Sequence, residues 1–124
     1  MTLTQKQIND LITGISLAAE LPAVSPQNRR FVNVMAYEIN ERGRIVRPDK
    51  ILDSSKIGTL HFYLRDYEVP AQYIENDQDI PDGDITYHLD DDNIMGISDL
   101  ERRLSALIPD FSVLVPEWET DDPL

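Results

Sequence analysis

The sequence offers two groups of residues that are suited to chemistry, a pair of histidines and a series of carboxylates in its second half. Histidine is the common acid–base residue near neutral pH, and His61 and His88 both lie in predicted strands where a carboxylate could reach them. No spacing in the sequence requires such a contact, so we interpret both as ordinary strand histidines. A small enzyme that uses carboxylates with His61 or His88 is kept as an alternative.

The densest carboxylates occupy a turn-rich segment and raise the question of a metal site. Asp77, Asp79, Asp82 and Asp84 are close in sequence, and clustered carboxylates suit a hard cation such as calcium. An EF-hand loop needs acids at positions 1, 3 and 5 and glycine at position 6, but counting from Asp77 puts Pro81 and Asp82 at the last two. Zinc is disfavoured because the chain has no cysteine and only 2 histidines. We therefore predict a solvated acidic loop with no metal and no cofactor.

Motifs for phosphate binding and nucleophilic catalysis are missing from the sequence. The 5 glycines form no dinucleotide-binding or phosphate-binding loop, and no serine lies in a nucleophile elbow. Basic residues cluster at Arg29-Arg30 and between residues 42 and 50, but the aromatic residues nearest to them, Phe31 and Tyr37, are assigned to the core rather than to base stacking. We predict that the chain is not an enzyme and does not bind nucleic acid.

The charge of the chain is large and unevenly divided. With 23 acidic and 11 basic residues, the formal net charge is −12 at pH 7 and the sequence pI is about 4.3. Residues 1–65 have a balance of +3, from nine basic and six acidic residues, while residues 66–124 have −15, from two basic and seventeen acidic residues. Such a surface repels nucleic-acid backbones and anionic membranes, and it favours a cationic partner.

Two helices are predicted from hydrophobic spacing and capping residues. The first begins after Thr4, presents apolar residues at helical spacing from Ile8 onward, and continues to about Leu21, where Pro22 stops it. The second covers residues 99–108, because Ser98 followed by Glu101 fits a capping box.

The strands are predicted from alternating apolar residues. Residues 25–39 are compatible with a helix or a strand, and we favour a strand that forms a hairpin with residues 44–46. Further strands are predicted at residues 59–65, 72–74, 85–89 and 111–115. The segment 75–84 and the run Asp90–Asp92 are expected to be acidic loops.

These elements predict an α+β fold: an antiparallel sheet of about four to six strands, on which the N-terminal helix and the second helix near residues 99–108 pack. Residues 1–115 are expected to form a single compact domain, and residues 116–124 an acidic tail that frays. No stretch resembles a targeting signal or a membrane span, and the chain has no cysteine, so we expect a cytoplasmic protein.

An acidic domain without catalytic motifs fits a protein whose function is binding. We expect it to neutralise a basic protein, as an immunity protein or antitoxin-type inhibitor of a toxin such as a nuclease would. The alternatives are a nucleic-acid mimic, the small enzyme described above and a structural accessory subunit. The predicted partner-binding acids are Glu75, Asp77, Asp79, Asp82, Asp84, Asp90, Asp91 and Asp92, and the predicted aromatic anchors are Tyr73, Tyr87 and Trp118.

Overall fold

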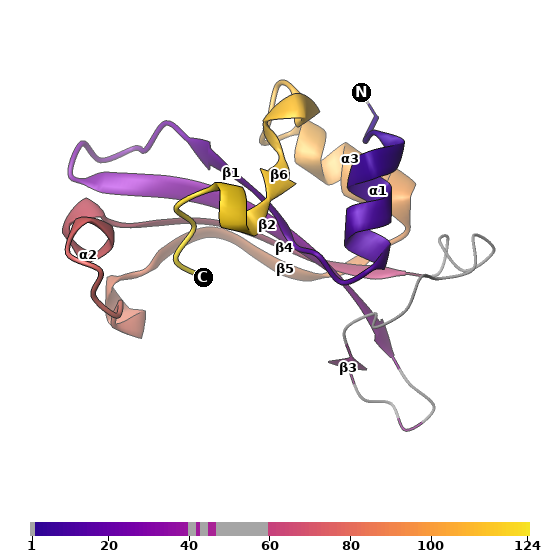
Figure 1. Ribbon diagram of the computed structural model, residues 1–124, viewed down its shortest axis with the longest axis horizontal. Coiled ribbons are helices and arrows are strands. Elements are labelled where there is room, and N and C mark those ends of the chain that lie inside the picture. The colour runs from indigo at the N-terminus through magenta and orange to yellow at the C-terminus, as the bar shows by residue number, and fades with distance from the viewer. Residues whose placement is uncertain (1, 40–41, 43–44, 47–59) are drawn as a thin grey trace.

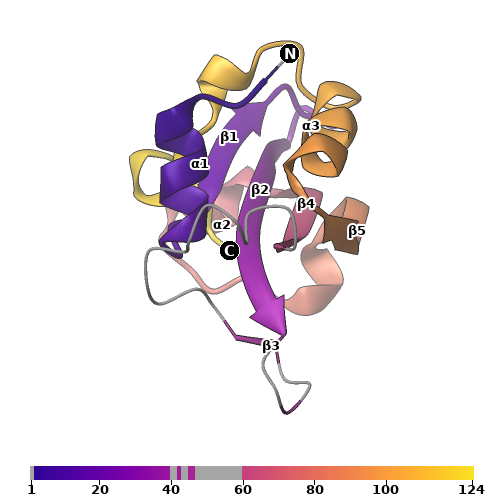
Figure 2. The same ribbon diagram turned by 90° about the vertical axis from the view of Figure 1, so that its right-hand side faces the viewer.

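A computed structural model describes residues 2–39, 42, 45–46 and 60–124 of the protein. The strands form one antiparallel sheet in the order β5-β4-β2-β1-β6, with β3 paired to β2 beside this path. Helices α1 and α3 lie side by side on one face of the sheet, and α2 lies at the far end of β4 (Figures 1 and 2). The arrangement confirms the predicted α+β fold. The strands are β1 (Leu17–Leu21), β2 (Asn28–Ile39), β3 (Ile45–Val46), β4 (His61–Pro70), β5 (Thr86–Met95) and β6 (Val115–Pro116), and the α-helices are α1 (Gln5–Ile12), α2 (Ala71–Glu75) and α3 (Ile97–Ser105).

The main core lies between the two long helices and the sheet. Alternate residues of β2 and β4 point toward the helices, because successive side chains of a strand point to opposite faces. Val34 and Leu64 are cross-strand partners on this face, and Leu104 of α3 is buried in the same cluster. Phe62 and Leu64 of β4 are buried on this side, which agrees with the alternating apolar residues that predicted a strand at residues 59–65.

A smaller apolar cluster lies on the opposite face of the sheet. Phe31 and Tyr67 are cross-strand partners and are fully buried together with Val69. Three isoleucines that follow β4 in the chain pack against this cluster, and they hold the segment from α2 to the start of β5 on the second face. These isoleucines are Ile74, Ile80 and Ile85.

The first helix begins as predicted but ends early. Thr4 is its N-cap, and the Thr4 and Gln7 side chains form a reciprocal capping box. The helix ends at Ile12 because Gly14 adopts a φ of 88°, a conformation that glycine tolerates and a helix does not. Residues 17–21, predicted as helix, instead form β1 between β2 and β6.

Residues 28–39 form a strand, as we favoured, and β2 pairs with β3 in antiparallel register. Residues 40, 41, 43 and 44 of the predicted hairpin and residue 59 of the next predicted strand lie outside the described residues. The strand predicted for residues 59–65 is β4, which extends beyond the prediction to Pro70; proline donates no hydrogen bond to a sheet and is typical of such a strand end.

Several element predictions in the second half are wrong. Residues 72–74 belong to helix α2 rather than to an edge strand, and residues 111–113 form a 3-10 turn that leaves only Val115–Pro116 as strand. Strand β5 runs on to Met95, so Asp90–Asp92 lie in a strand rather than in a loop. Helix α3 starts after Gly96, whose φ is 84°, so Ser98 is not its cap. The Glu101 carboxylate accepts a hydrogen bond from the Leu3 N–H at 2.6 Å instead.

Candidate functional site

The predicted acidic loop forms an exposed segment on the second face of the sheet. This acidic segment consists of α2, a connecting loop and the 3-10 turn Asp82–Asp84, so the prediction that residues 75–84 are all loop is wrong at Glu75 and at the turn. Its isoleucines hold it against the sheet while its acids face outward. Within the described part of the chain, no hydrogen bond or ion pair joins the side chains of Asp77, Asp79 or Asp82. All the acids predicted here are exposed: Glu75, Asp77, Asp79, Asp82 and Asp84.

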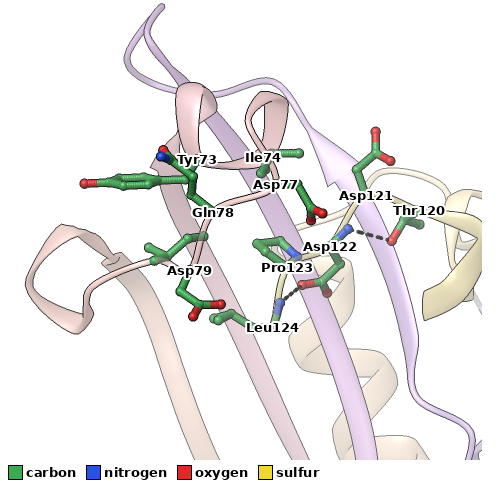
Figure 3. Close-up of a pocket in the computed structure, with 11 residues that line it drawn as sticks. Tyr73, Ile74, Asp77, Gln78, Asp79, Thr120, Asp121, Asp122, Pro123 and Leu124 are labelled. Atoms are coloured by element: carbon green, nitrogen blue, oxygen red, sulfur yellow. Dashed lines mark hydrogen bonds between the residues drawn. The ribbon is translucent and has the colours of Figure 1, made fainter.

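A groove of about 650 Å³ separates this segment from the C-terminal tail. Asp77 and Asp79 contribute to one wall, and Asp121 and Asp122 to the other, so two acidic segments distant in the sequence line one depression. Figure 3 shows Pro123 and Leu124 lying between Asp79 and the rest of the tail. None of the described residues that line the groove is basic.

The tail makes specific contacts with the sheet. Asp122 accepts hydrogen bonds from Asn33 at 3.0 Å and from the Tyr67 hydroxyl. Burial raises the pKa of Tyr67, and the charge and hydrogen bond of Asp122 raise it further. Asp121 pairs with Arg29 at 2.9 Å. The predicted fraying of residues 116–124 concerns motion in solution and stays a prediction, but the structure gives this segment defined partners.

The three aspartates of β5 do not form one acidic face. Asp90 accepts a hydrogen bond from the Tyr63 hydroxyl, which lies on the second face, and burial together with this bond raises the pKa of Tyr63 to about 12. Asp91 instead pairs with Arg103 of α3, on the helix-bearing side. Asp92 is exposed. Asp90 and Asp91 are thus engaged within the fold and are less available to a partner than we expected.

The predicted aromatic anchors have different surroundings. Trp118 is 68% exposed in the 3-10 turn Glu117–Glu119, two residues before Thr120, which lines the groove. Tyr87 is 44% exposed and packs its ring 6.2 Å from that of Tyr67. Tyr73 donates its hydroxyl to Asp84, and this hydrogen bond raises the Tyr73 pKa. Trp118 is therefore the most accessible of the three.

A pair of buried carboxylates on β4 was not among the predicted site residues. Asp66 and Glu68 are 0% and 2% exposed, and Arg30 binds both Asp66 oxygens, at 2.8 and 2.6 Å. The signal was present, because both acids continue the alternation that buries Phe62 and Leu64. Two buried acids at consecutive inward positions require cationic or hydrogen-bonding partners.

Glu68 connects three parts of the chain. Its Oε1 accepts hydrogen bonds from the N–H groups of Val24 and Ser25 at 3.1 and 3.3 Å, and its Oε2 lies 2.5 Å from His88 Nε2. Burial raises the Glu68 pKa, but the bonds to His88 and to the backbone outweigh it, so the pKa lies below its ordinary value. His61 lies elsewhere, stacked 5.3 Å from the Tyr37 ring.

Neither a metal centre nor a membrane span is found among the residues that the structure describes. No group of three or more histidine, aspartate or glutamate side chains in them is arranged to hold a metal ion, and none of their helices is long and apolar enough to cross a membrane. Comparisons of the chain with protein-family models, with curated proteins and with solved structures give no match.

Proposed function

We propose that this chain is a small acidic binding protein that neutralises a basic protein partner, in the manner of an immunity protein or an antitoxin-type inhibitor of a toxin such as a nuclease. The observation that carries the proposal is the groove between the acidic segment and the tail. It is lined by carboxylates from both sides and by no basic residue among those described.

The two walls of the groove differ in how available their charges are. Asp122 is bonded to the sheet and Asp121 to Arg29. Asp77 and Asp79, on the other wall, have no such partner in the described chain. Unpaired exposed acids attract a cationic surface without first losing an internal contact, so this wall supplies the electrostatic attraction.

Charge alone gives little affinity, because rim charges stay hydrated and mainly affect the association rate. A binding site also needs an aromatic or apolar anchor that becomes buried on association. Trp118, which is 68% exposed within the tail, is the residue suited to that role.

The enzyme alternative would draw on His88 and Glu68. Their contact is of the kind that orients a general base. Glu68, however, is 2% exposed and accepts hydrogen bonds from the backbone of Val24 and Ser25. These contacts explain the buried carboxylate by a structural role. We therefore place the function in binding.

The experiment that tests the proposal is capture of partners from the native cell with the purified chain at low and high salt. We expect a protein of high pI that is retained at low salt and released at high salt. Trp118→Ala should weaken its binding at least about tenfold, whereas Val113→Ala, a change at another exposed apolar residue, should not. An acidic partner, or equal binding by the Trp118→Ala variant, would contradict the proposal.

A further inference from the structure

The second face of the sheet holds the Asp122 carboxylate with donors from two strands. The Asn33 amide of β2 donates to one carboxylate oxygen at 3.0 Å, and the Tyr67 hydroxyl of β4 donates to the other. Asn33 is 4% exposed and Tyr67 is 0% exposed. A buried donor left without an acceptor costs about 1–3 kcal/mol, so a segment that covers these two groups must supply the acceptor, as Asp122 does.

These donors are held in place by contacts that do not involve the tail. Arg65 Nε donates to the Asn33 side-chain oxygen at 2.9 Å, which directs the Asn33 NH₂ group outward to the tail. The Tyr67 ring packs 5.9 Å from that of Phe31 and 6.2 Å from that of Tyr87. The sheet therefore presents the same two donors to any ligand that reaches them.

A second carboxylate is recognised beside the first. Arg29 Nη2 donates to Asp121 at 2.9 Å, and Glu20 accepts from Arg29 Nε at 2.7 Å, so the guanidinium is also positioned by the sheet. The hydrogen bonds to Glu20 and Asp121 raise the Arg29 pKa. Asp121 and Asp122 thus bind separate donors, Asp121 to Arg29 and Asp122 to Asn33 and Tyr67. This arrangement favours a peptide that has two neighbouring carboxylates.

The tail is attached to the fold through a short connection. Strand β6 pairs with β1 over only two residue pairs, Leu17 with Pro116 and Ala18 with Val115. Beyond it, Asp121, Pro123 and Leu124 are exposed. Segments with few buried contacts open at low free-energy cost, so the tail can leave its site without unfolding the sheet.

We propose that Arg29, Asn33 and Tyr67 form a binding site for an acidic peptide with two adjacent carboxylates, and that residues 120–124 occupy it as an internal, displaceable ligand. The tail then inhibits the site. An internal ligand competes at an effective concentration of about millimolar, so an external peptide binds well only when the internal anchor is removed. The inference does not depend on the proposed basic partner.

The test uses the full chain with Asp122→Ala and a fluorescent peptide of residues 117–124. We expect a protease that cleaves after acidic residues to cut the variant's tail at least several times faster than the wild-type tail. The peptide should bind the variant at least tenfold more tightly than it binds the wild type. Adding Tyr67→Phe to the variant, or replacing the second aspartate of the peptide by alanine, should abolish that gain.

Asp10→Ala is the control, because it removes one carboxylate from α1, on the other face of the sheet and away from the sheet donors. It should leave tail cleavage and peptide binding as in the wild type. Should Asp122→Ala fail to fold, Asp122→Asn keeps the side-chain size and removes the charge, and it should show a smaller gain of the same sign. The proposal is overturned if the tail of the Asp122→Ala variant resists the protease as well as the wild-type tail does. It is also overturned if the variant's tail is cleaved faster but the variant does not bind the peptide.

Discussion

Two Arg–Asp ion pairs with the same N–O distance differ in burial, and burial determines how much each contributes to stability. Arg30–Asp66 and Arg102–Asp99 both have an N–O distance of 2.6 Å. The Asp66 side chain is 1% exposed, whereas the Arg102 side chain is 71% exposed. Removing a partner from a buried pair leaves an uncompensated charge, while an exposed pair is screened by water and salt.

Arg30→Ala should therefore lower the free energy of unfolding by about 3 kcal/mol. Arg102→Ala, the matched control, should change it by less than about 1 kcal/mol. Urea unfolding followed by circular dichroism measures both values. Similar losses in the two variants would mean that Asp66 recovers its hydration when Arg30 is removed.

Glu68 makes the stability of the fold depend on pH, and its contribution decreases as the pH falls. Its pKa in the folded protein lies below the ordinary value of 4.5, so the folded state favours the ionised carboxylate. Its contribution to stability is fully present above pH 4.5 and is lost as the pH falls through the lower, folded pKa. The lost bonds would release Val24, Ser25 and His88 together.

Glu68→Gln should destabilise the protein at pH 7 by about 1–3 kcal/mol, because an amide cannot replace the ionised acceptor. The difference in unfolding free energy between wild type and variant should shrink as the pH is lowered below 4.5. Thermal unfolding across this range checks it, with the exposed Asp79→Asn as control. A difference that is constant with pH would show that the charge of Glu68 does not stabilise the fold.

At the scale of elements, periodicity predicted strands better than it predicted where helices end. The inward alternation of Phe62 and Leu64 defined β4, but the apolar residues after Thr13 satisfied helical and extended spacing equally. Gly14 decided between them through its positive φ, which becomes favourable only when residues 17–21 find β2 as a partner. Sequence periodicity contains no information about that pairing.

The predicted site shows the same limit. The exposed acids from Glu75 to Asp84 were recoverable from composition and turn residues. The partners of Asp90, Asp91 and Asp122 were not, since Tyr63, Arg103 and Tyr67 are distant in sequence. Buried Asp66 and Glu68 were visible in the strand pattern, but their partners again depend on tertiary contacts.

The end of α1 gives a testable consequence of positive φ. Gly14→Ala places a Cβ on a residue with φ 88°, and this should cost about 1–2 kcal/mol of stability. Gly83→Ala is the control, because a Cβ there would meet no atom within 4 Å, so we expect a change of at most about 0.5 kcal/mol. Thermal unfolding of both variants measures the contrast, and equal effects would rule out Gly14 as the helix terminator.

At the scale of the whole molecule, the count of 23 acidic residues overstates the number of carboxylates that are available to a partner. Asp66, Glu68 and Asp91 are paired inside the fold, and Asp122 is bound to the sheet. Four acids without such partners, Glu75, Asp77, Asp79 and Asp82, lie on the segment from α2 to the 3-10 turn. This segment lies on the face opposite α1 and α3 (Figure 1), whereas the exposed Asp92 and Glu119 lie outside it. The charge of the molecule is therefore unevenly distributed, and its acidic side can attract and orient an approaching cationic partner.

This polarity predicts how a basic partner associates. The association rate constant should fall at least tenfold between low and physiological ionic strength, because screening removes the attraction beyond the Debye length of about 8 Å. Asp79→Asn should reduce the rate at low salt, whereas Asp10→Asn, which removes an equal charge from α1 on the other face, should reduce it less. Stopped-flow mixing with the captured partner measures all three rates. Equal effects of the two substitutions would assign the attraction to total charge rather than to the acidic side, and a rate indifferent to salt would exclude electrostatic steering.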